Sequence, residues 1–332
     1  MIGQDTHEVE RKILAILEIL NDSREPLGGR VISRRLEEKG IGLCERAVRY
    51  HLKIMDERGF TRSVGRRDGR EIAPPGLEEL RSALVCDKLG FLTSRMELLA
   101  YLTTFDVNTH KGDIPIDVSL FDAEDFAAAL KTMGGIFKAG LCVSDLIAIV
   151  SEGEKLGEVI VPEGKIGLAT VSCIVISGLL LKSGIPLDSR FAGLVEMHDF
   201  QPCHFVELIE YHGSTIDPVE IFIASKMTSV SNAVKKGEGR VLASFYEIPV
   251  LSRPATEAVL EKLKKINLCN LFVIGKTTEL TGKITVNSNK LGLVLFSGLN
   301  PVAAATEEGI HVINKVMGGV IEVSRLRSFS NS

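Results

Sequence analysis

The chain has 332 residues and a formal net charge of −4, and 45% of its residues are hydrophobic. This length exceeds a typical domain of roughly 100–200 residues, so we expect two or three folding units. The longest apolar run, residues 171–181, is too short to cross a bilayer, and we therefore expect a cytoplasmic protein without membrane association. The six cysteines form no Cys-x-x-Cys pair, and His198, Cys203, His204 and His212 match no ligand spacing, so no disulfide scaffold, metal or cofactor is expected.

The charge is unevenly distributed along the chain. Residues 1–75 carry 15 Lys and Arg against 13 Asp and Glu, whereas the remainder carries 24 against 30. A DNA-binding module needs a cationic surface, and the N-terminal part is the one that can supply it.

Three helices are predicted in the N-terminal part. Apolar residues recur at helical spacing from Val9 to Leu20, a second short helix ends at Gly40, and a third runs from Glu45 to Arg58. The third helix buries a stripe that contains Val48 and Leu52, and its opposite face is basic. This order is typical of a helix-turn-helix, whose last helix enters the major groove.

Residues 59–72 predict two short strands around an Asp-Gly turn, which would form a wing. A basic hairpin alone is more often a solvated surface, but its position after the three helices favours DNA binding. We therefore predict a winged helix-turn-helix over residues 1–75 that binds double-stranded operator DNA as a homodimer on two half-sites. The candidate contacts are Arg46, Arg49, Tyr50 and Lys53 on the helix, for bases or backbone, and Arg62, Arg66, Arg67 and Arg70 in the wing, for phosphates.

Residues 76–115 predict a connecting helical segment that either supports dimerisation or packs on the domain that follows. Beyond it lies an internal repeat with an offset of 125 residues. The matching pairs are 118–121 with 243–246, 157–161 with 282–286, 165–168 with 290–293, and Ser172 with Ser297; with one inserted residue, 193–197 pairs with 319–323. We predict a duplicated α/β domain, α+β overall, over residues 116–325, with halves of about 116–200 and 241–325 related by pseudo-twofold symmetry.

A ligand is expected in the cleft between the halves. In the segment 297–301, Asn300 is predicted to cap a helix that has Pro301 as its first residue, so that free amides could bind an anion; an ordinary capped helix is equally compatible. His212, Ser214 and Thr215 supply further hydrogen-bond donors, although such residues also form routine turns. The candidate effector-binding residues are Ser172, Cys173, Arg190, His212, Gly213, Ser214, Thr215, Arg253, Ser297, Gly298, Leu299, Asn300 and Pro301, with Arg190 or Arg253 as a bidentate cation or a surface residue.

The sequence shows no nucleophile beside a base, no paired acids at helical spacing and no P-loop. This pattern argues against an enzyme. An enzyme fused to a DNA-binding module stays as the less favoured alternative.

Seven segments of the chain carry a resemblance to a known family: residues 45–53, 169–171, 184–186, 189–191, 211–223, 227–230 and 298–304. In these segments the chain resembles the NrpR family of archaeal nitrogen regulatory repressors. The resemblance implies a repressor of nitrogen-assimilation genes that binds its operator as a dimer and is released by 2-oxoglutarate, a small dicarboxylate. Many members carry two regulatory domains where this chain has one, and Cys44 stands where a Ser would cap the third helix better, by about 1 kcal/mol. The alternative is the same architecture with a different effector, such as an amino acid, a nucleotide or another small anion.

Overall fold

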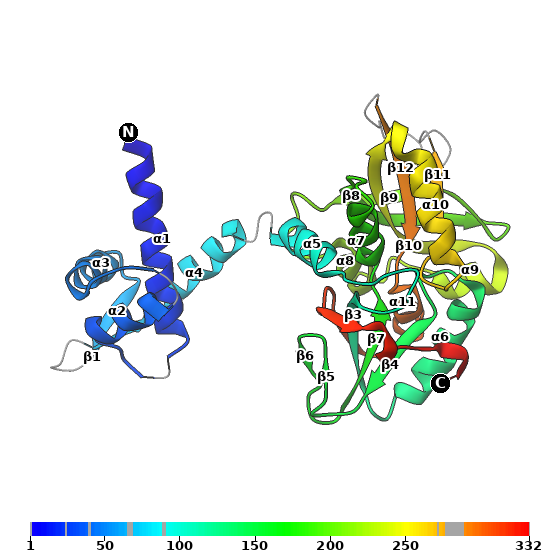
Figure 1. The fold of residues 1–332 in the computed structure, drawn as a ribbon. Coiled ribbons are helices and arrows are strands. Elements are labelled where there is room, and N and C mark those ends of the chain that lie inside the picture. Colours follow the sequence, from blue (N-terminus) through cyan, green and yellow to red (C-terminus); the bar gives the residue numbers. More distant parts are fainter. Residues whose placement is uncertain are drawn as a thin grey trace. The chain divides into compact units, whose positions relative to one another are not determined.

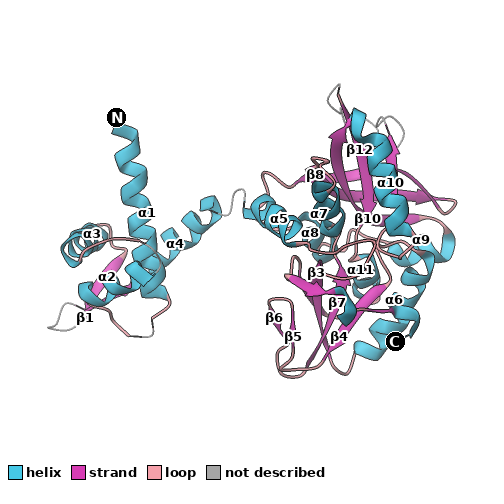
Figure 2. Cartoon of the chain, in the orientation of Figure 1, coloured by secondary structure: helices cyan, strands magenta, loops and turns pink. Residues whose placement is uncertain are grey.

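The computed structural model describes residues 2–23, 25–38, 41–64, 69–87, 91–270, 272–275 and 289–331. The chain divides into two compact units, Met1–Leu89 and Gly90–Ser332, and each has a hydrophobic core of its own. Both helices and strands are present, in agreement with the predicted mixed α/β class (Figures 1 and 2). Within the described ranges, no helix is both long and apolar enough to span a membrane.

The first unit has the predicted three helices followed by a two-stranded wing. Its elements are α1 (Ile2–Asn21), α2 (Gly29–Glu38), α3 (Glu45–Glu57), β1 (Thr61–Val64), β2 (Gly69–Ile72) and α4 (Pro74–Asp87). Ile16, Ile32 and Val48 are fully buried in one core, because the apolar stripes of the helices face one another. Leu27 forms an antiparallel β-bridge with Arg70 and so adds a third short segment beside the hairpin of β1 and β2. The turn of this hairpin, residues 65–68, lies outside the described residues.

The helical segment expected as a connector is divided between the units. Leu80 of α4 is 4% exposed and packs in the core of the first unit. Leu99 of α5 (Phe91–Leu102) is fully buried in the core of the second unit. The boundary between the units accordingly falls at residues 89–90, because each helix buries its apolar side chains in a different core.

The second unit, called the regulatory unit here, contains two antiparallel sheets. The first has the strand order β13-β3-β7-β4-β15, with β14 also paired to β3, and the second has the order β11-β12-β10-β8-β9. The strands of the first sheet are β3 (Asp113–Asp122), β4 (Leu146–Val150), β7 (Lys165–Val171), β13 (Val312–Lys315), β14 (Val320–Glu322) and β15 (Arg327–Ser328). Those of the second are β8 (Asp188–His198), β9 (Gln201–Glu210), β10 (Gly239–Pro249), β11 (Phe272–Gly275) and β12 (Lys290–Phe296).

Helices cover these sheets (Figure 1). They are α6 (Phe126–Ala139), α7 (Ile174–Lys182), α8 (Pro218–Ala224), α9 (Val230–Lys236), α10 (Arg253–Lys264) and α11 (Asn300–Glu307), and a small hairpin is formed by β5 (Lys155–Leu156) and β6 (Val159–Ile160). Helix α6 packs on α11, and α7 packs on both α5 and α10. Met133 and Ile136 of α6 share a core with Phe121, whereas Leu260 and Leu263 of α10 share another with β12.

The predicted duplication is visible in the strand order, together with an exchange that the sequence did not reveal. Among the described residues, each repeat runs strand, helix, strand, strand, helix, and the first repeat adds the hairpin of β5 and β6. Strands β3, β4 and β7 therefore correspond to β10, β11 and β12. The last strand of the first repeat, β8, joins the second sheet, and β13 and β14 of the second repeat join the first sheet. Each sheet is therefore completed by a strand from the other repeat.

The register corrects one part of the repeat alignment. The 125-residue offset relates β7 to β12, since Lys165 and Lys290 both begin these strands. Asp122 faces Lys165 and Pro249 faces Lys290, so β3 and β10 are related by 127 residues instead of 125. A shift of two keeps every side chain on the same face, which is why alternating apolar residues alone could not detect it. The segment 282–286 of the alignment lies outside the described residues.

Candidate functional sites

Helix α3 presents one polar face to solvent. Arg46, Arg49, Tyr50 and Lys53 are all exposed, with 63% of Tyr50 accessible, and their spacing places them on one side of the helix. Val48, Leu52 and Met55 form the opposite, buried face. The helix begins after Cys44, which occupies the capping position but makes no side-chain capping bond, as the sequence predicted. This face carries three cations and one aromatic ring that can reach a partner.

Two exposed arginines, one in α3 and one in the wing, form ion pairs with neighbouring glutamates. Arg49 pairs with Glu45 at 2.8 Å, one turn away on the same helix. Arg62 pairs across the hairpin with Glu71. Both pairs are largely exposed, so a phosphate could displace the carboxylate at small energetic cost.

Arg70 has a different environment. Its side chain is 20% exposed, bonds Asp56 at the end of α3 at 2.9 Å and donates to the hydroxyl of Ser63 at 3.1 Å. These contacts tie the wing to α3, so Arg70 is a structural residue in this arrangement, unlike the phosphate contact expected from its position in the wing. Arg66 and Arg67 lie outside the described residues.

In the regulatory unit, the ends of β7 and β12 meet around a small cavity, called the axis cavity here. Its volume is about 30 Å³. The lining residues are Met96, Asp117, Ser172, Cys173, Ile174, Tyr211, Asp217, Val219, Ser244, Tyr246, Ser297, Leu299, Val316 and Met317. Four of the predicted effector residues, Ser172, Cys173, Ser297 and Leu299, are therefore brought together.

The contacts at the axis cavity are reciprocal. The thiol of Cys173 donates to the carbonyl oxygen of Phe296 at 3.5 Å. At the matching position in the other repeat, a Cβ on Gly298 would collide with the carbonyl oxygen of Val171, so only glycine fits there. The strand registers also make Asp117 and Ser244 counterparts. The axis cavity thus lies where a pseudo-twofold axis relates the two repeats.

The polar groups of the axis cavity are hydroxyls and carboxyls. Tyr211 and Ser244 share a hydrogen bond of 3.0 Å. Asp117 accepts the N–H of Met317 at 2.8 Å, and burial raises its pKa to about 6. Asp217 accepts the N–H of Val219 at the start of α8, and burial raises its pKa to about 7. The residues that line the axis cavity include no Lys, Arg or His, so the site offers donors and protonatable acids to a ligand.

The segment 297–301 differs from its expected role. Helix α11 begins at Asn300, and Leu299 holds the capping position. The fully buried side chain of Asn300 instead accepts the N–H of Leu242 and donates to its carbonyl oxygen, each near 2.9 Å, and it also donates to the carbonyl oxygen of Leu141. The amides of Ser297, Leu299 and Asn300 already have partners within the fold. Asn300 therefore fastens α11 to β10, and Pro301 is buried in the first turn of α11.

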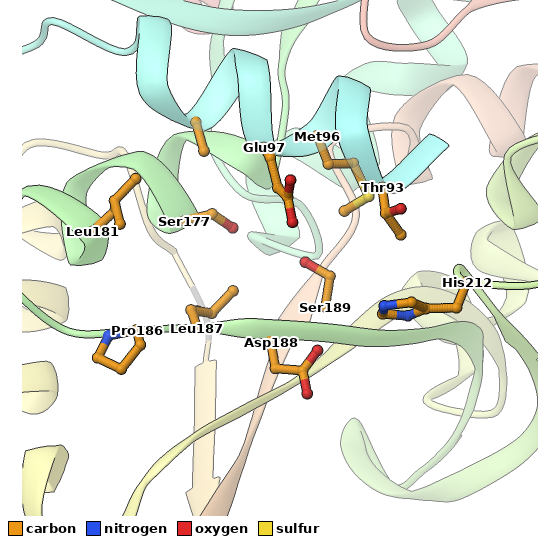
Figure 3. A pocket seen from close by; sticks show the side chains of 11 residues that line it. Thr93, Met96, Glu97, Ser177, Leu181, Pro186, Leu187, Asp188, Ser189 and His212 are labelled. Carbon is orange, nitrogen blue, oxygen red and sulfur yellow. The ribbon is translucent and has the colours of Figure 1, made fainter. Parts of the chain in front are cut away.

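A second, wider pocket of about 330 Å³ opens beside the axis cavity and is called the outer pocket here. Helices α5 and α7, strand β8 and the segment before it, and His212 surround it; the lining residues are Thr93, Met96, Glu97, Ala100, Ser177, Leu181, Pro186, Leu187, Asp188, Ser189 and His212 (Figure 3). The hydroxyls of Ser177 and Ser189 point toward its centre. The buried Ser177 oxygen has no hydrogen-bond partner in the described part of the chain.

The remaining predicted effector residues lie apart from both cavities. Ser214 donates to the carbonyl oxygen of Glu210 in the same turn, and Gly213 and Thr215 flank it. Arg190 bonds the buried carboxylate of Glu247 at 3.3 Å. Arg253 pairs with Glu257 at 2.8 Å, one turn along α10. Both arginines are thus engaged in ion pairs, and neither lines a cavity described above.

Several residues that line the axis cavity were not predicted from the sequence, among them Met96, Asp117, Asp217, Ser244, Tyr211 and Tyr246. For Asp117 and Ser244 a signal was present, because each interrupts an apolar strand that is otherwise buried. Burial also raises the pKa of Cys173 to about 12, so its thiol stays protonated near neutral pH. Within the described ranges, no group of three or more His, Cys, Asp or Glu side chains is placed to hold a metal.

Comparison with known families agrees with both units. Residues 89–328 match the family described as NrpR regulatory domains NRD1 and 2. Residues 14–80 match the ribonuclease R winged-helix domain. A crystal structure of a nitrogen repressor-like protein from Methanococcus jannaschii is 26% identical, with a TM-score of 0.59, and covers 71% of this chain and 97% of that one.

Three curated relatives are similar over most of the chain. The global nitrogen regulator NrpRI of Methanosarcina mazei is 35% identical over 96% of this chain and 98% of its own length. The global nitrogen regulators NrpR of Methanocaldococcus jannaschii and Methanococcus maripaludis are 32% and 31% identical over 98% and 89% of this chain. The chain spans about half the length of these two, 56% and 51%. This protein therefore belongs to the NrpR family of nitrogen regulators.

Proposed function

We propose that this chain is a transcriptional repressor of nitrogen-assimilation genes that binds operator DNA as a homodimer, and that 2-oxoglutarate releases it from the DNA. Family membership supports the nitrogen-regulatory role. The observation that carries the DNA-binding part is the exposed face of α3, where Arg46, Tyr50 and Lys53 lie together on a winged helix. Such a helix fits the major groove, where arginine reads guanine edges and aromatic or basic groups contact the backbone.

A dimer is proposed because the DNA-facing surface of a single winged-helix unit carries acidic as well as basic side chains. Glu45 partly neutralises the positive charge of Arg49, and Glu71 partly neutralises that of Arg62. Counterion release scales with the number of phosphates neutralised, so few free cations give weak binding to one half-site. Two modules joined in a dimer multiply these weak contacts.

The effector site is proposed at the axis cavity and the outer pocket beside it. The hydroxyls of Ser172, Ser297 and Ser244 can donate to a carboxylate, and each charge-assisted bond contributes about 1.5–3 kcal/mol. The axis cavity lies between the repeats, so a ligand that widens it can shift one repeat relative to the other. That shift is the proposed link between effector binding and DNA release.

Fluorescence anisotropy tests this function. The full chain selects a labelled fragment from a random DNA pool, and 2-oxoglutarate is then titrated into the complex, with succinate and glutamate in parallel. We expect 2-oxoglutarate to lower the anisotropy. Arg46→Ala should weaken DNA binding, whereas Lys235→Ala, which removes an exposed lysine paired with Glu308 in the regulatory unit, should not. Failure to select any fragment would refute the DNA-binding role, and equal insensitivity to all three acids would refute the effector.

A second candidate effector is an amino acid. The specific observation in its favour is the pair Asp117 and Asp217, which line a cavity whose lining includes no basic side chain and which could accept an ammonium group. The titration with glutamate distinguishes this case, because an amino-acid effector would act where 2-oxoglutarate does not.

A further inference from the structure

We propose that the effector site has two chambers, the axis cavity and the outer pocket, and that the side chain of Met96 is the gate between them and selects which dicarboxylates enter. This inference rests on the proposed function. Among the described residues, Met96 is the one that lines both cavities. It is 7% exposed and projects from α5 at the edge of the outer pocket (Figure 3). Tyr211 lines the axis cavity and His212, the next residue, lines the outer pocket, so adjacent residues of the chain border the two cavities.

The two cavity volumes differ about tenfold, and the smaller one must widen before a dicarboxylate can enter it. At about 30 Å³, the axis cavity has room for about one water molecule, and a five-carbon dicarboxylate is much larger. The outer pocket, at about 330 Å³, falls within the usual range for small-ligand sites. A dicarboxylate can therefore enter the outer pocket as it stands, but it reaches the axis hydroxyls only if the axis cavity widens.

The polar groups are divided between the two cavities. Ser172 and Ser297 face the axis cavity, while Ser177 and His212 face the outer pocket. The Ser177 hydroxyl is buried without a partner among the described residues, which is costly unless a ligand supplies one. A linear molecule with an acceptor at each end would satisfy both sets when Met96 swings aside. The site would thus select dicarboxylates by the distance between their two carboxylates.

Methionine suits this role chemically. Its unbranched side chain has three rotatable bonds and changes rotamer more readily than a branched residue of similar volume. Helix α5 is also the first helix of the regulatory unit, and the chain joins it to α4 of the winged-helix unit through residues 88–90. Displacement of Met96 acts directly on the helix nearest in sequence to the DNA-binding unit.

Stopped-flow binding of 2-oxoglutarate to the full chain tests the gate. Met96→Ala should raise the association rate constant by an order of magnitude or more and should admit longer dicarboxylates such as 2-oxoadipate. Met96→Leu retains the volume with a stiffer side chain and should slow association. Leu99→Ala is the matched control, because Leu99 is fully buried on the same helix and lines neither cavity. The control should bind at the parental rate even though it unfolds at a lower temperature.

The outcomes separate the gate from the function on which it rests. If the parent binds 2-oxoglutarate and both Met96 variants associate at the parental rate, the gate is refuted and the proposed effector stands. If the parent does not bind 2-oxoglutarate, the proposed effector and the gate both fail. If Met96→Ala does not fold, an unchanged association rate and ligand selectivity in Met96→Leu alone would refute the gate.

Discussion

Replacing Asp117 with Asn should stabilise the regulatory unit in a pH-dependent way. Asp117 is 7% exposed in the middle of β3, and burial raises its pKa from 3.8 to about 6. Between these two values the folded chain binds more protons than the unfolded chain, so the stability contributed by this group falls as the pH rises through about 6. Above that pH, keeping the carboxylate ionised in the fold costs about 3 kcal/mol, since each pKa unit corresponds to about 1.4 kcal/mol.

The Asp117→Asn variant would keep a side-chain oxygen that accepts the Met317 N–H but would carry no charge at this position. The difference in free energy of unfolding between variant and parent should therefore grow by about 2 kcal/mol between about pH 4.5 and pH 8. Urea unfolding followed by near-ultraviolet circular dichroism measures it, because the buried rings of Tyr211 and Tyr246 report on this unit.

Glu124→Gln is the control for this experiment. Glu124 is exposed in the same unit, so its replacement should leave the pH dependence of the parent unchanged. A constant difference between Asp117→Asn and the parent at both pH values would contradict the claim that this carboxyl is desolvated.

The contacts of Asn300, Cys44 and Asp217 carry three more predictions. Asn300→Leu should lower the free energy of unfolding by about 2–4 kcal/mol, because the N–H of Leu242 and the carbonyl oxygen of Leu141 lose the Asn300 side chain, while the carbonyl oxygen of Leu242 keeps the N–H of Ser297. Thermal unfolding measures this loss, and a parental melting temperature would contradict it. Cys44→Ser should raise the stability of the winged-helix unit by about 1 kcal/mol in urea unfolding, and no gain would show that the serine does not cap α3. The affinity for 2-oxoglutarate, measured by calorimetric titration, should fall about tenfold per pH unit above pH 7. A ligand carboxylate beside Asp217 requires that acid, whose pKa is about 7, to take up a proton. Asp217→Asn should flatten this pH dependence, and a parental affinity that does not change with pH would refute the coupling.

The winged helix was largely predictable because its signals are local. The apolar stripe containing Val48 and Leu52 identifies the buried face of α3, and the exposed face follows from the same helical period. The role of Arg70 was not predictable in this way. Its partner Asp56 lies 14 residues away and across the fold, and no periodicity records that contact.

In the regulatory unit, the sequence predicted the internal repeat but not the residues that form the candidate site. A 125-residue offset reveals the duplication. The exchange of β8 for β13 and β14 between the sheets does not change the pattern of apolar residues within any strand, so the sequence gives no sign of it. Asn300 looked like a helix cap because its neighbours allow one, while its true partner is 58 residues away in β10. Met96 carries no distinguishing signal, since it is one apolar residue in a helical stripe and gains its position only from the packing of α5 on α7.

The exchanged strands also constrain how the regulatory unit folds and how it could have arisen. A single repeat in isolation lacks the strand that completes its sheet, so it would leave an unpaired edge open to association. Two copies of such a repeat could close both edges by each lending its last strand to the other, as in a domain-swapped dimer. The present chain has the topology expected if such a pair had been joined end to end. Each sheet requires distant parts of the chain, so the regulatory unit should fold slowly and as one cooperative unit. Separating the two repeats should unfold both of them.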